Sequence, residues 1–480
     1  MGLSKRLEDN LEVMRERLGE GISFDVIVRQ IVVGGKRAAL IFLDGMVKDV
    51  VATSVIRSLQ SASTEAVRPN AVEKLLGHVI PFMEVSVVET LNEAIDQVLA
   101  GPMILLIDGE RSAIILDLRE YPVRSIEEPD LERVTRGSRE GFVETLVFNT
   151  ALIRRRLRDP NLRFRMHTVG TRTKTDVVIA YIEGVVDPDL LDRVQRKVLS
   201  AGDDALPLGA KSLEEYISDA PASPVPTVRF TERPDVAVAH LLEGHVLVIV
   251  DTTPMVMILP ATLWHFTQHA EEFFQTPTAG SYLRGVRILG MLVALLLTPT
   301  WLALVRSKSH LPEWLSWLGP QESYLLPLWL QFLLLEFGVD LIRMALIHTP
   351  NALATSLGIV GAILLGELAI EVGLFVPETI LFTSLAVLGY FATPSIEFGL
   401  AVRLGRYILL ILAAVWALPG LAVGLLAIFT YLSLLKSQGV PYLWPLIPLD
   451  SRALFSLLFR HPVPSVRGRK ARHVIKDPQP

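Results

Sequence analysis

The sequence contains no cysteine. Disulfide bridges, thiolate metal sites and a cysteine nucleophile are therefore excluded, and cysteine usage carries no information about the redox compartment. An excess of charge of one sign is absent as well, because the formal net charge is −5 over 480 residues. A chain with this balance creates no overall field that would attract nucleic acid or another polyanion. We therefore expect no nucleic-acid partner.

A signal peptide is also missing. Residues 1–21 read MGLSKRLEDNLEVMRERLGEG, and charged residues interrupt this stretch too often for the apolar core of a secretion signal. Leu7, Leu11 and Leu18 instead fall on one stripe at helical spacing. The stretch is predicted to be an amphipathic helix, and the N-terminal half is expected to stay in the cytoplasm.

Motifs of enzymes and metal sites are lacking too. The Gly-Gly-Lys at 34–36 follows an alternating strand without the spacing of a phosphate loop, so it predicts a hairpin turn. His265 and His269 share a helix face near Glu272, but no glutamate directly follows the first histidine as in the zincin pattern. No nucleophile elbow or dinucleotide fingerprint is present. We predict no catalytic residue, no cofactor, no metal site and no enzyme activity.

Two segments of the N-terminal half show the same order of predicted elements. Residues 24–120 begin with the strand pair FDVIVRQIVVGGKRAALIFLDGMV and end with QVLAGPMILLID and AIILDL, with two helices between the pairs. Residues 163–260 repeat this order with RFRMHTVGTRTKTDVVIAYIEGVV, HLLEGHVLVIVD and VMIL. Four landmarks keep their order and nearly their spacing, which favours an internal duplication over chance agreement among apolar strands. The pattern predicts a soluble α/β region of two repeated α/β units.

The segment between the units contains a predicted helix with a basic end. Residues 141–157 suit a helix, and Arg154, Arg155, Arg156 and Arg158 gather at its C-terminus. Cations at this end complement the helix dipole. Acidic residues are interleaved with the arginines and no stacking aromatic residues accompany them, so we expect a contact surface with another subunit rather than a nucleic-acid site.

The C-terminal half carries long apolar stretches. A helix needs roughly 20 apolar residues to cross the hydrocarbon core, because every backbone polar group must be satisfied internally. Charge-free runs lie at 288–305, 324–335, 351–366, 379–396 and 407–435. Such a number of apolar runs favours a membrane domain over the core helices of a soluble protein. The preceding stretch TLWHFTQHAEEFFQT is rich in aromatic residues, which predicts a helical elbow at the membrane–water boundary.

The number of membrane passes follows less directly. With the N-terminal half inside, the loop expected around Arg403 and Arg406 falls on the cytoplasmic side, in line with the positive-inside rule. Five passes would place the basic tail outside, against the same rule, and six would return it. Pro419-Gly420 interrupts the longest run and marks either a kink or the break of a hairpin. We expect both ends of the chain on the inside.

Ionisable residues within these runs are the candidate functional residues. Glu336, Asp340 and Arg343 share a helix face by their spacing. Three further carboxylates stand near the ends of the neighbouring runs: Glu367, Glu371 and Glu378. A charge in the bilayer costs at least about 2.5–3.5 kcal/mol, so it should face water or a partner. Two interpretations stay open, a pathway for cations and an intramembrane charge network that fastens helices.

Several long blocks resemble one known family, the A subunits of spore germinant receptors, called the GerA family. The blocks are RGSREGFVETLVFNTALIRRRLRDP (136–160), VGTRTKTDV (169–177), RFTERPDVAVAHLLEGHV (229–246), FTQHAEEFFQTP (266–277), ALIHTPNALATSLG (345–358) and PYLWPLIP (441–448). The resemblance extends from about residue 24 to 464. It departs at Ile396, where the family pattern has an aromatic residue, and over the last 16 residues, which match nothing in the family.

The resemblance implies a multi-pass subunit in the inner membrane of a bacterial endospore. Members are thought to form ring-like homo-oligomers, proposed to be pentamers, that conduct monovalent cations early in germination. A small partner membrane protein and other germination proteins are implied as partners, together with membrane lipids. A non-conducting scaffold subunit of the same complex is the alternative.

Together these observations predict an α/β soluble region of two repeated units, followed by a multi-pass α-helical membrane domain. The expected division is an amphipathic N-terminal helix (1–22), a first α/β unit (23–122), a connecting helical segment (123–162), a second α/β unit (163–260), an interfacial elbow helix (261–284), a transmembrane helical domain of five or six passes (285–450) and a basic cytoplasmic tail (451–480).

Overall fold

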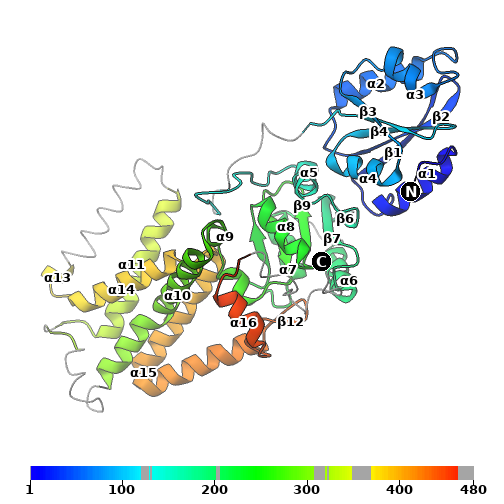
Figure 1. Ribbon diagram of the computed structural model, residues 1–480. Coiled ribbons are helices and arrows are strands. Elements are labelled where there is room, and N and C mark those ends of the chain that lie inside the picture. The colour runs from blue at the N-terminus through cyan, green and yellow to red at the C-terminus, as the bar shows by residue number, and fades with distance from the viewer. Residues whose placement is uncertain are drawn as a thin grey trace.

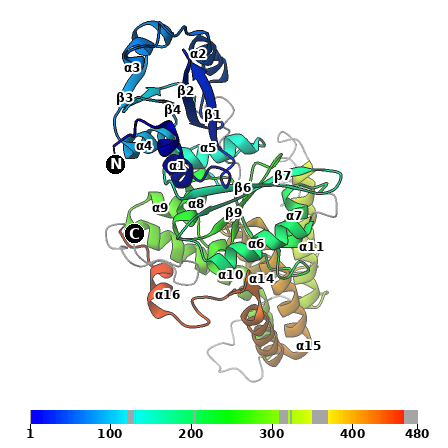
Figure 2. The same ribbon diagram turned by 90° about the vertical axis from the view of Figure 1, so that its right-hand side faces the viewer.

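A computed structural model shows an α/β region of two sheets and a region of long helices (Figure 1). The structure describes residues 2–120, 129, 132–201, 206–307, 319–321, 324–348 and 369–462. Figures 1 and 2 both place the second sheet between the first sheet and the long helices. The predicted α/β region with two sheets is therefore confirmed.

The first unit is a five-stranded antiparallel sheet with helices on both faces. Its strands lie in the order β1-β2-β4-β5-β3. Helices α1 and α4 pack on one face, and α2, α3 and the π-helical turn η1 pack on the other. Its elements are α1 (Leu7–Leu18), β1 (Val26–Val33), β2 (Lys36–Leu43), α2 (Asp49–Ser61), α3 (Ala71–Lys74), η1 (Leu75–Val79), β3 (Val85–Val88), α4 (Leu91–Ala100), β4 (Met103–Ile107) and β5 (Ala113–Leu116).

The hairpin predicted at the Gly-Gly-Lys is confirmed. Gly34 and Gly35 join β1 to β2, and both have a positive φ, of 52° and 77°. A two-residue hairpin turn of this hand needs positive φ at both positions, which glycine adopts without steric cost. A side chain at Gly34 would also collide with Val67, because a Cβ there would lie 2.4 Å from its Cγ2.

The second unit has the same topology. Its strands lie in the order β6-β7-β9-β10-β8, again antiparallel throughout. Helices α6 and α7 cover one face, and α5 and α8 cover the other. Its elements are α5 (Leu146–Arg156), β6 (Leu162–Val169), β7 (Thr175–Ile182), α6 (Pro188–Ser200), α7 (Ala210–Ile217), β8 (Arg229–Thr231), α8 (Pro234–Leu242), β9 (Val246–Val250) and β10 (Val256–Leu259).

The two sheets extend the predicted repeat in two ways. Each contains a short edge strand, β3 or β8, that the sequence pattern did not reveal. Each is also preceded by a helix, α1 or α5, that packs on the same face as the helix before the last strand pair. Identical strand order and equivalent helices support the duplication.

The basic end of α5 joins the two units of this chain. Arg154 is buried, and its Nη2 lies 2.9 Å from Oδ2 of Asp25, which stands at the start of the first sheet. The Phe24 N–H donates to the Phe164 carbonyl oxygen at 3.0 Å, which links the units directly. The expected contact surface with another subunit is therefore wrong for Arg154, because its charge is satisfied between the two units of one chain.

The predicted elbow is not one helix. A 3₁₀ turn and a short helix occupy it, and α10 then begins with proline at its first position, where the missing N–H costs nothing. The elements from there are η3 (Leu263–Phe266), α9 (Glu271–Phe274), α10 (Pro277–Arg306), α11 (Leu328–His348), α13 (Ala369–Glu371), α14 (Pro377–Phe391), α15 (Ile396–Leu434), β11 (Lys436–Ser437), β12 (Val440–Pro441) and α16 (Ser451–Leu458).

Two helices in the described part of the chain, α10 and α15, are long and apolar enough to cross a membrane. Helix α14 is apolar but shorter, and α11 carries three charged residues. The predicted run at 351–366 lies outside the described residues. Length and composition thus support membrane-crossing segments, and the number of five or six passes stays a prediction.

Helix α15 is a helical hairpin. Ala417 has a non-helical backbone, with φ 52° and ψ −130°, two residues before Pro419. A Cβ at Gly424 would lie 2.7 Å from Leu409 Cδ2, a contact that is impossible within one straight helix. Of the two alternatives at Pro419-Gly420, the structure shows the hairpin break. The arms of about 21 and 17 residues would be about 31 and 26 Å long at 1.5 Å per residue.

Both ends of this hairpin return to the second α/β unit. In the first turn, Glu397 lines the same pocket as Lys211 and Glu214 of the second unit, and Phe398 stacks on Phe266 of the elbow, with ring centroids 6.0 Å apart. Near the other end, the Tyr431 hydroxyl donates to Ser223 Oγ at 2.7 Å. The segment after the hairpin is also docked there, because Ser437 Oγ donates to the Thr227 carbonyl oxygen at 2.7 Å. The described C-terminal segment therefore lies on the same side of the long helices as the α/β region.

Candidate functional site

The charged residues of the helical region meet in one buried cluster. Arg406 Nη2 donates to Glu336 Oε2 at 2.6 Å, and neither side chain is more than 1 % exposed. Arg403 pairs with Asp340 and lies 3.5 Å from the same Glu336 oxygen. Arg406 Nη1 also donates to the Ala294 carbonyl oxygen at 2.8 Å. Three helices, α10, α11 and α15, therefore share one polar centre.

Helical spacing builds this cluster from both sides. Glu336 and Asp340 are four residues apart on α11, and Arg403 and Arg406 are three apart on α15. Residues at these spacings share a helix face, so one pair of carboxylates meets one pair of guanidinium groups. Desolvation of such charges costs several kcal/mol, and close pairing offsets the cost.

Two tyrosines complete the cluster. The Tyr407 hydroxyl donates to Asp340 Oδ2 at 2.9 Å. The guanidinium of Arg343 lies 5.1 Å from the ring centroid of Tyr390 on α14, and that of Arg403 lies 5.5 Å from the same centroid. Aromatic faces attract cations at these distances. The cluster therefore contacts every helix of this region that is longer than ten residues in the described part of the chain.

The charge balance defines what the cluster does. Two carboxylates face two arginines, so it presents no net negative charge to a passing cation. The ion pairs join α11 to α15, and this arrangement is compatible with the interpretation of a charge network, which stays a prediction. Oε1 of Glu336 is nevertheless buried without a hydrogen-bond partner among the described residues. That acceptor remains available to a water molecule or a cation.

The remaining predicted site residues lie elsewhere. Glu371 is exposed at the end of α13. Glu378 lies in the first turn of α14, where its Oε1 accepts the Gln321 N–H at 3.2 Å. Glu367 lies outside the described residues. Of the six predicted residues, the structure therefore brings together Glu336 and Asp340, and Arg343 lies against the Tyr390 ring that Arg403 also contacts.

Sequence reasoning missed the partners of the carboxylates. It placed Arg403 and Arg406 in a cytoplasmic loop, and this is wrong, since both are buried within α15. A signal was present: the two arginines stand three residues apart in a stretch that is apolar on both sides. Two arginines at this spacing share a helix face. They are therefore as suitable as Arg343 to pair with the two carboxylates on one face of α11.

A group of three histidines lies outside the helical region. The rings of His240, His245 and His265 are 5.1–5.4 Å apart, centroid to centroid. Burial lowers the pKa of His245 to about 4, and it lowers the pKa values of His240 and His265 well below the ordinary 6.5. All three are therefore neutral near pH 7.

The histidine group does not resemble a metal site. The Thr262 N–H donates to Nδ1 of His265 at 3.0 Å, so the proton of this neutral ring is on Nε2 and blocks that nitrogen as a ligand. His269 does not join the group, because its Nδ1 accepts the Glu271 N–H at 3.2 Å. No set of three or more His, Asp or Glu side chains is placed to hold a metal ion in the described ranges.

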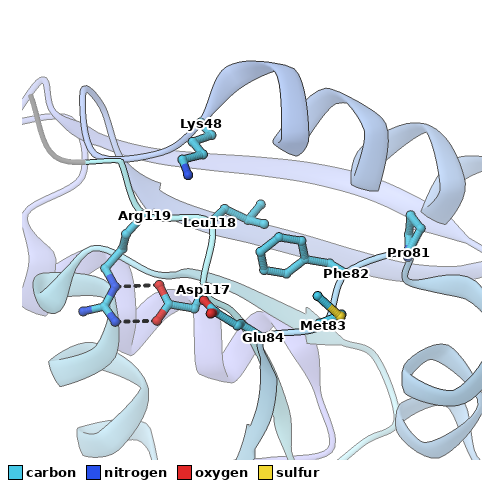
Figure 3. A pocket seen from close by; sticks show the side chains of 8 residues that line it. All are labelled: Lys48, Pro81, Phe82, Met83, Glu84, Asp117, Leu118 and Arg119. Carbon is cyan, nitrogen blue, oxygen red and sulfur yellow. Dashed lines mark hydrogen bonds and ion pairs between the residues drawn. The ribbon is translucent and has the colours of Figure 1, made fainter. Parts of the chain in front are cut away.

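A cavity of about 540 Å³ opens on the first unit (Figure 3). Phe82, Met83 and Leu118 form its apolar wall, and Lys48 and Glu84 bring charges of opposite sign. On one side Asp117 and Arg119 form a two-bond ion pair with each other. Apolar side chains and charges of both signs line this cavity, and Met83 on its wall is largely exposed.

Comparison with known proteins decides the family. The family described as "Bacillus/Clostridium GerA spore germination protein" matches residues 12–472. The chain belongs to the GerA family. This confirms the resemblance drawn from the sequence blocks, and residues of the charge cluster, the histidine group and the cavity all lie inside the matched range.

Three proteins are similar to this chain along nearly its whole length. Stage V sporulation protein AF of Bacillus subtilis (strain 168) is 43% identical over 98% of this chain and 95% of its own length. Spore germination protein GerLA of Bacillus cereus is 32% identical over 99% of this chain and 98% of its own. "Uncharacterized membrane protein YfkQ" of B. subtilis is 30% identical over 96% and 90%. The sequence blocks that resemble the GerA family also resemble its stage V sporulation member, and the 43% identity agrees with that resemblance.

A solved structure covers part of this GerA-family protein. The N-terminal domain of the A subunit of the Bacillus megaterium spore germinant receptor GerK3 matches 55% of this chain and 98% of that chain, with a TM-score of 0.42 and 25% identity. The protein is thus a member of a sporulation and spore germination family, and none of the relatives named here carries the name of an enzyme.

Proposed function

We propose that this protein is a multi-pass subunit of a spore germination complex in the inner membrane of the endospore. Several copies, five in the simplest case, assemble into a channel that releases monovalent cations during germination. A small partner membrane protein and other germination proteins complete the complex. The α/β region lies in the cytoplasm and acts as the assembly or sensing module.

One observation carries this proposal. The helical region is apolar outside and charged inside, since Leu289 and Leu426 are 61% and 66% exposed while Glu336 and Arg406 are buried. This distribution suits helices surrounded by lipid, where a charge must face a partner or water. Membership of the GerA family supplies the biological setting.

The path of the chain supports an even number of passes. Helix α15 folds back at Ala417, and Glu397 before it and Tyr431 after it both lie against the second unit. An even number places the C-terminal segment on the side of the α/β region, in agreement with its docking there through Ser437.

Within this proposal Glu336, Asp340 and Arg343 belong to a charge network that fixes the helices, rather than to a ring of free carboxylates. The unpartnered Oε1 of Glu336 is the point at which the network and a cation path could meet. Glu367, Glu371 and Glu378 are candidates for the path itself, Glu371 through its exposure and Glu378 through its place at a helix start.

A non-conducting scaffold is the second candidate. It is favoured by the pairing of Glu336 and Asp340 with arginines of the same chain, which leaves the cluster without net negative charge. In this case the helices only anchor the protein, and the α/β units recruit other germination proteins.

Cation efflux from liposomes separates the two candidates. The purified protein is reconstituted with and without its partner membrane protein, and efflux of monovalent cations is measured. Glu336→Gln with Asp340→Asn should change flux or ion selectivity, while Glu371→Gln on the exposed end of α13 should leave the network intact. A quadruple variant combines Glu336→Gln and Asp340→Asn with Arg403→Gln and Arg406→Gln. It keeps the cluster neutral and controls for loss of packing.

Each outcome has a clear meaning when assembly is verified by size. Unchanged flux in the assembled double variant removes Glu336 and Asp340 from the path. Absence of flux from every assembled form, with and without the partner, contradicts the channel and favours the scaffold.

A further inference from the structure

The last described helix, α16, is tied to the start of the first apolar helix. The Arg460 N–H donates to Ser281 Oγ at 2.9 Å, and Arg460 Nη2 donates to the Phe273 carbonyl oxygen at 2.6 Å. Arg284 donates to the Leu457 carbonyl oxygen. The helix is therefore held beside the elbow and the first turns of α10, as both ribbon views show (Figures 1 and 2).

This helix turns large apolar side chains toward solvent. Phe455 and Phe459 are 55% and 48% exposed, and their rings lie 4.8 Å apart. Leu449, just before the helix, is 70% exposed. On the elbow side Phe273 and Tyr282 are 51% and 72% exposed. Apolar residues in such a group mark an interaction surface rather than ordinary scattered exposure.

The position of these exposed apolar side chains relative to α10 indicates which surface covers them. Leu289 is exposed on α10 and follows Tyr282 by seven residues, or about 10 Å along the helix axis. If α10 crosses a bilayer, Leu289 lies in the hydrocarbon layer and Tyr282 lies about one headgroup layer above it. Helix α16, fixed at Ser281 and Arg284, is then at the same level as Tyr282.

The charge of the segment fits an anionic surface. Arg452 is exposed on α16. Residues 463–480 carry five further cations against one carboxylate: Arg467, Arg469, Lys470, Arg472 and Lys476 against Asp477. Each basic residue near an anionic bilayer contributes on the order of 1 kcal/mol to binding. Aromatic and basic residues together are the composition of interfacial helices.

We propose that α16 lies in the headgroup layer of an anionic bilayer, with Phe455 and Phe459 inserted, and clamps the start of α10 to the membrane surface. Helix α16 is thus a membrane-binding element rather than part of a free cytoplasmic tail. This inference rests on the membrane location in the proposed function, but not on cation conduction.

The absence of cysteine makes a direct test possible, because a single introduced cysteine carries a label uniquely. Three variants are labelled with an environment-sensitive nitrobenzoxadiazole dye: Phe455→Cys, Leu289→Cys and Ser61→Cys. Ser61 is exposed on α2 of the first unit and reports the aqueous environment. The full-length protein is reconstituted alone into vesicles of phosphatidylglycerol and phosphatidylcholine that contain lipids with a quencher at the headgroup or deep in the acyl chain.

The label at 455 should be quenched most by the headgroup quencher, the label at 289 by the deep quencher, and the label at 61 by neither. In vesicles of phosphatidylcholine alone, quenching at 455 should fall by about twofold or more, because the cations lose their lipid partners. Arg452→Gln should reduce the quenching at 455 in the same direction.

The three labels also separate failure of this inference from failure of the membrane location. Quenching at 289 with a label at 455 as exposed as that at 61 overturns the inference alone. Lack of quenching at 289 overturns the membrane location. Protection of the label at 455 only after a germination partner protein is added shows a protein contact instead, and also overturns the proposal.

Discussion

The α/β region and the helical region of this protein distribute their side chains in opposite ways. The sheets of the α/β region enclose four apolar clusters, and β4 and β9 are buried along their whole length. The helical region exposes leucine and phenylalanine on its outer faces and buries Glu336, Arg403 and Arg406. The first arrangement is suited to an aqueous surrounding. The second arrangement is suited to an apolar surrounding. The distribution of exposed and buried side chains therefore indicates a different solvent for each region.

Both regions nevertheless contain buried pairs of an arginine and a carboxylate that join separate parts of the chain. Arg154 joins the two α/β units through Asp25, and Arg406 joins α15 to α11 through Glu336. In the α/β region the pair is an addition to large apolar cores. In the helical region, lipid competes equally well for apolar surfaces, so polar contacts carry more of the specificity. This difference predicts that removal of one partner of a buried ion pair lowers the free energy of unfolding more in the helical region than in the α/β region.

The sharpest test of the comparison is removal of one partner in the helical cluster. Glu336→Ala leaves Arg406 buried without its carboxylate and should lower the free energy of unfolding by about 3–5 kcal/mol. Thermal unfolding in nanodiscs measures this. Glu336→Leu combined with Arg406→Met should recover most of the loss, because no unpaired charge remains. A double variant as unstable as the single one would contradict the pairing.

The equivalent change in the α/β region should be smaller. Arg154→Ala is expected to cost about 3 kcal/mol, because Asp25 keeps the Ser23 hydroxyl as a hydrogen-bond donor at 2.6 Å. Denaturant unfolding of the detergent-purified protein measures the loss. Arg158→Ala, exposed one turn further on, serves as the matched control and should change stability by less than about 0.5 kcal/mol. A loss at Arg154 no larger than that at Arg158 would show that the pair does not hold the units together.

Acid should weaken the junction at the histidine group. His245 takes up its proton near pH 6.5 in the unfolded chain and only near pH 4 in the native state. The unfolded state therefore binds more protons within this window, so stability is complete above pH 6.5 and falls by up to about 3 kcal/mol as the pH drops toward 4. The charge of Arg229 nearby acts in the same direction.

Unfolding measured at a series of pH values tests this sign. His245→Gln should reduce the loss of stability below pH 6.5, and the loss that remains should come from His240 and His265, whose pKa values burial also lowers. A steeper loss of stability in acid for His245→Gln would reverse the assignment.

The smallest expected effect concerns the close approach of α10 and α14. A Cβ at Gly389 would lie 2.2 Å from the Gly290 carbonyl oxygen, so Gly389→Ala must push the helices apart at a cost of about 1–3 kcal/mol. Gly285→Ala on α10 meets no atom within 4 Å and should be neutral or stabilising by up to about 1 kcal/mol. Thermal unfolding of the two variants side by side measures the difference. Equal effects would show that the helices do not touch at Gly290.

Sequence patterns predicted those features that depend on neighbours along the chain. The hairpin at Gly34-Gly35 follows from two residues that accept positive φ, and the shared face of Glu336 and Asp340 follows from helical spacing. The edge strand β8 was missed because three residues give no measurable alternation. Elbow residues 262–276 were predicted as one helix, but they form the 3₁₀ turn η3 and the short helix α9, and Phe266 packs with Phe398 and Tyr442.

The amino-acid sequence by itself determined the family, the two α/β units, the apolar character of the C-terminal half and the helix face on which the carboxylates lie. Only the tertiary structure decided that Arg403 and Arg406 are their partners, that Arg154 joins two units of one chain, and that α15 folds back on itself at Ala417. The physical reason is range. Backbone preference and periodicity act over a few residues, whereas a buried charge selects its partner by distance in space, here across about 70 residues of chain from Glu336 to Arg406.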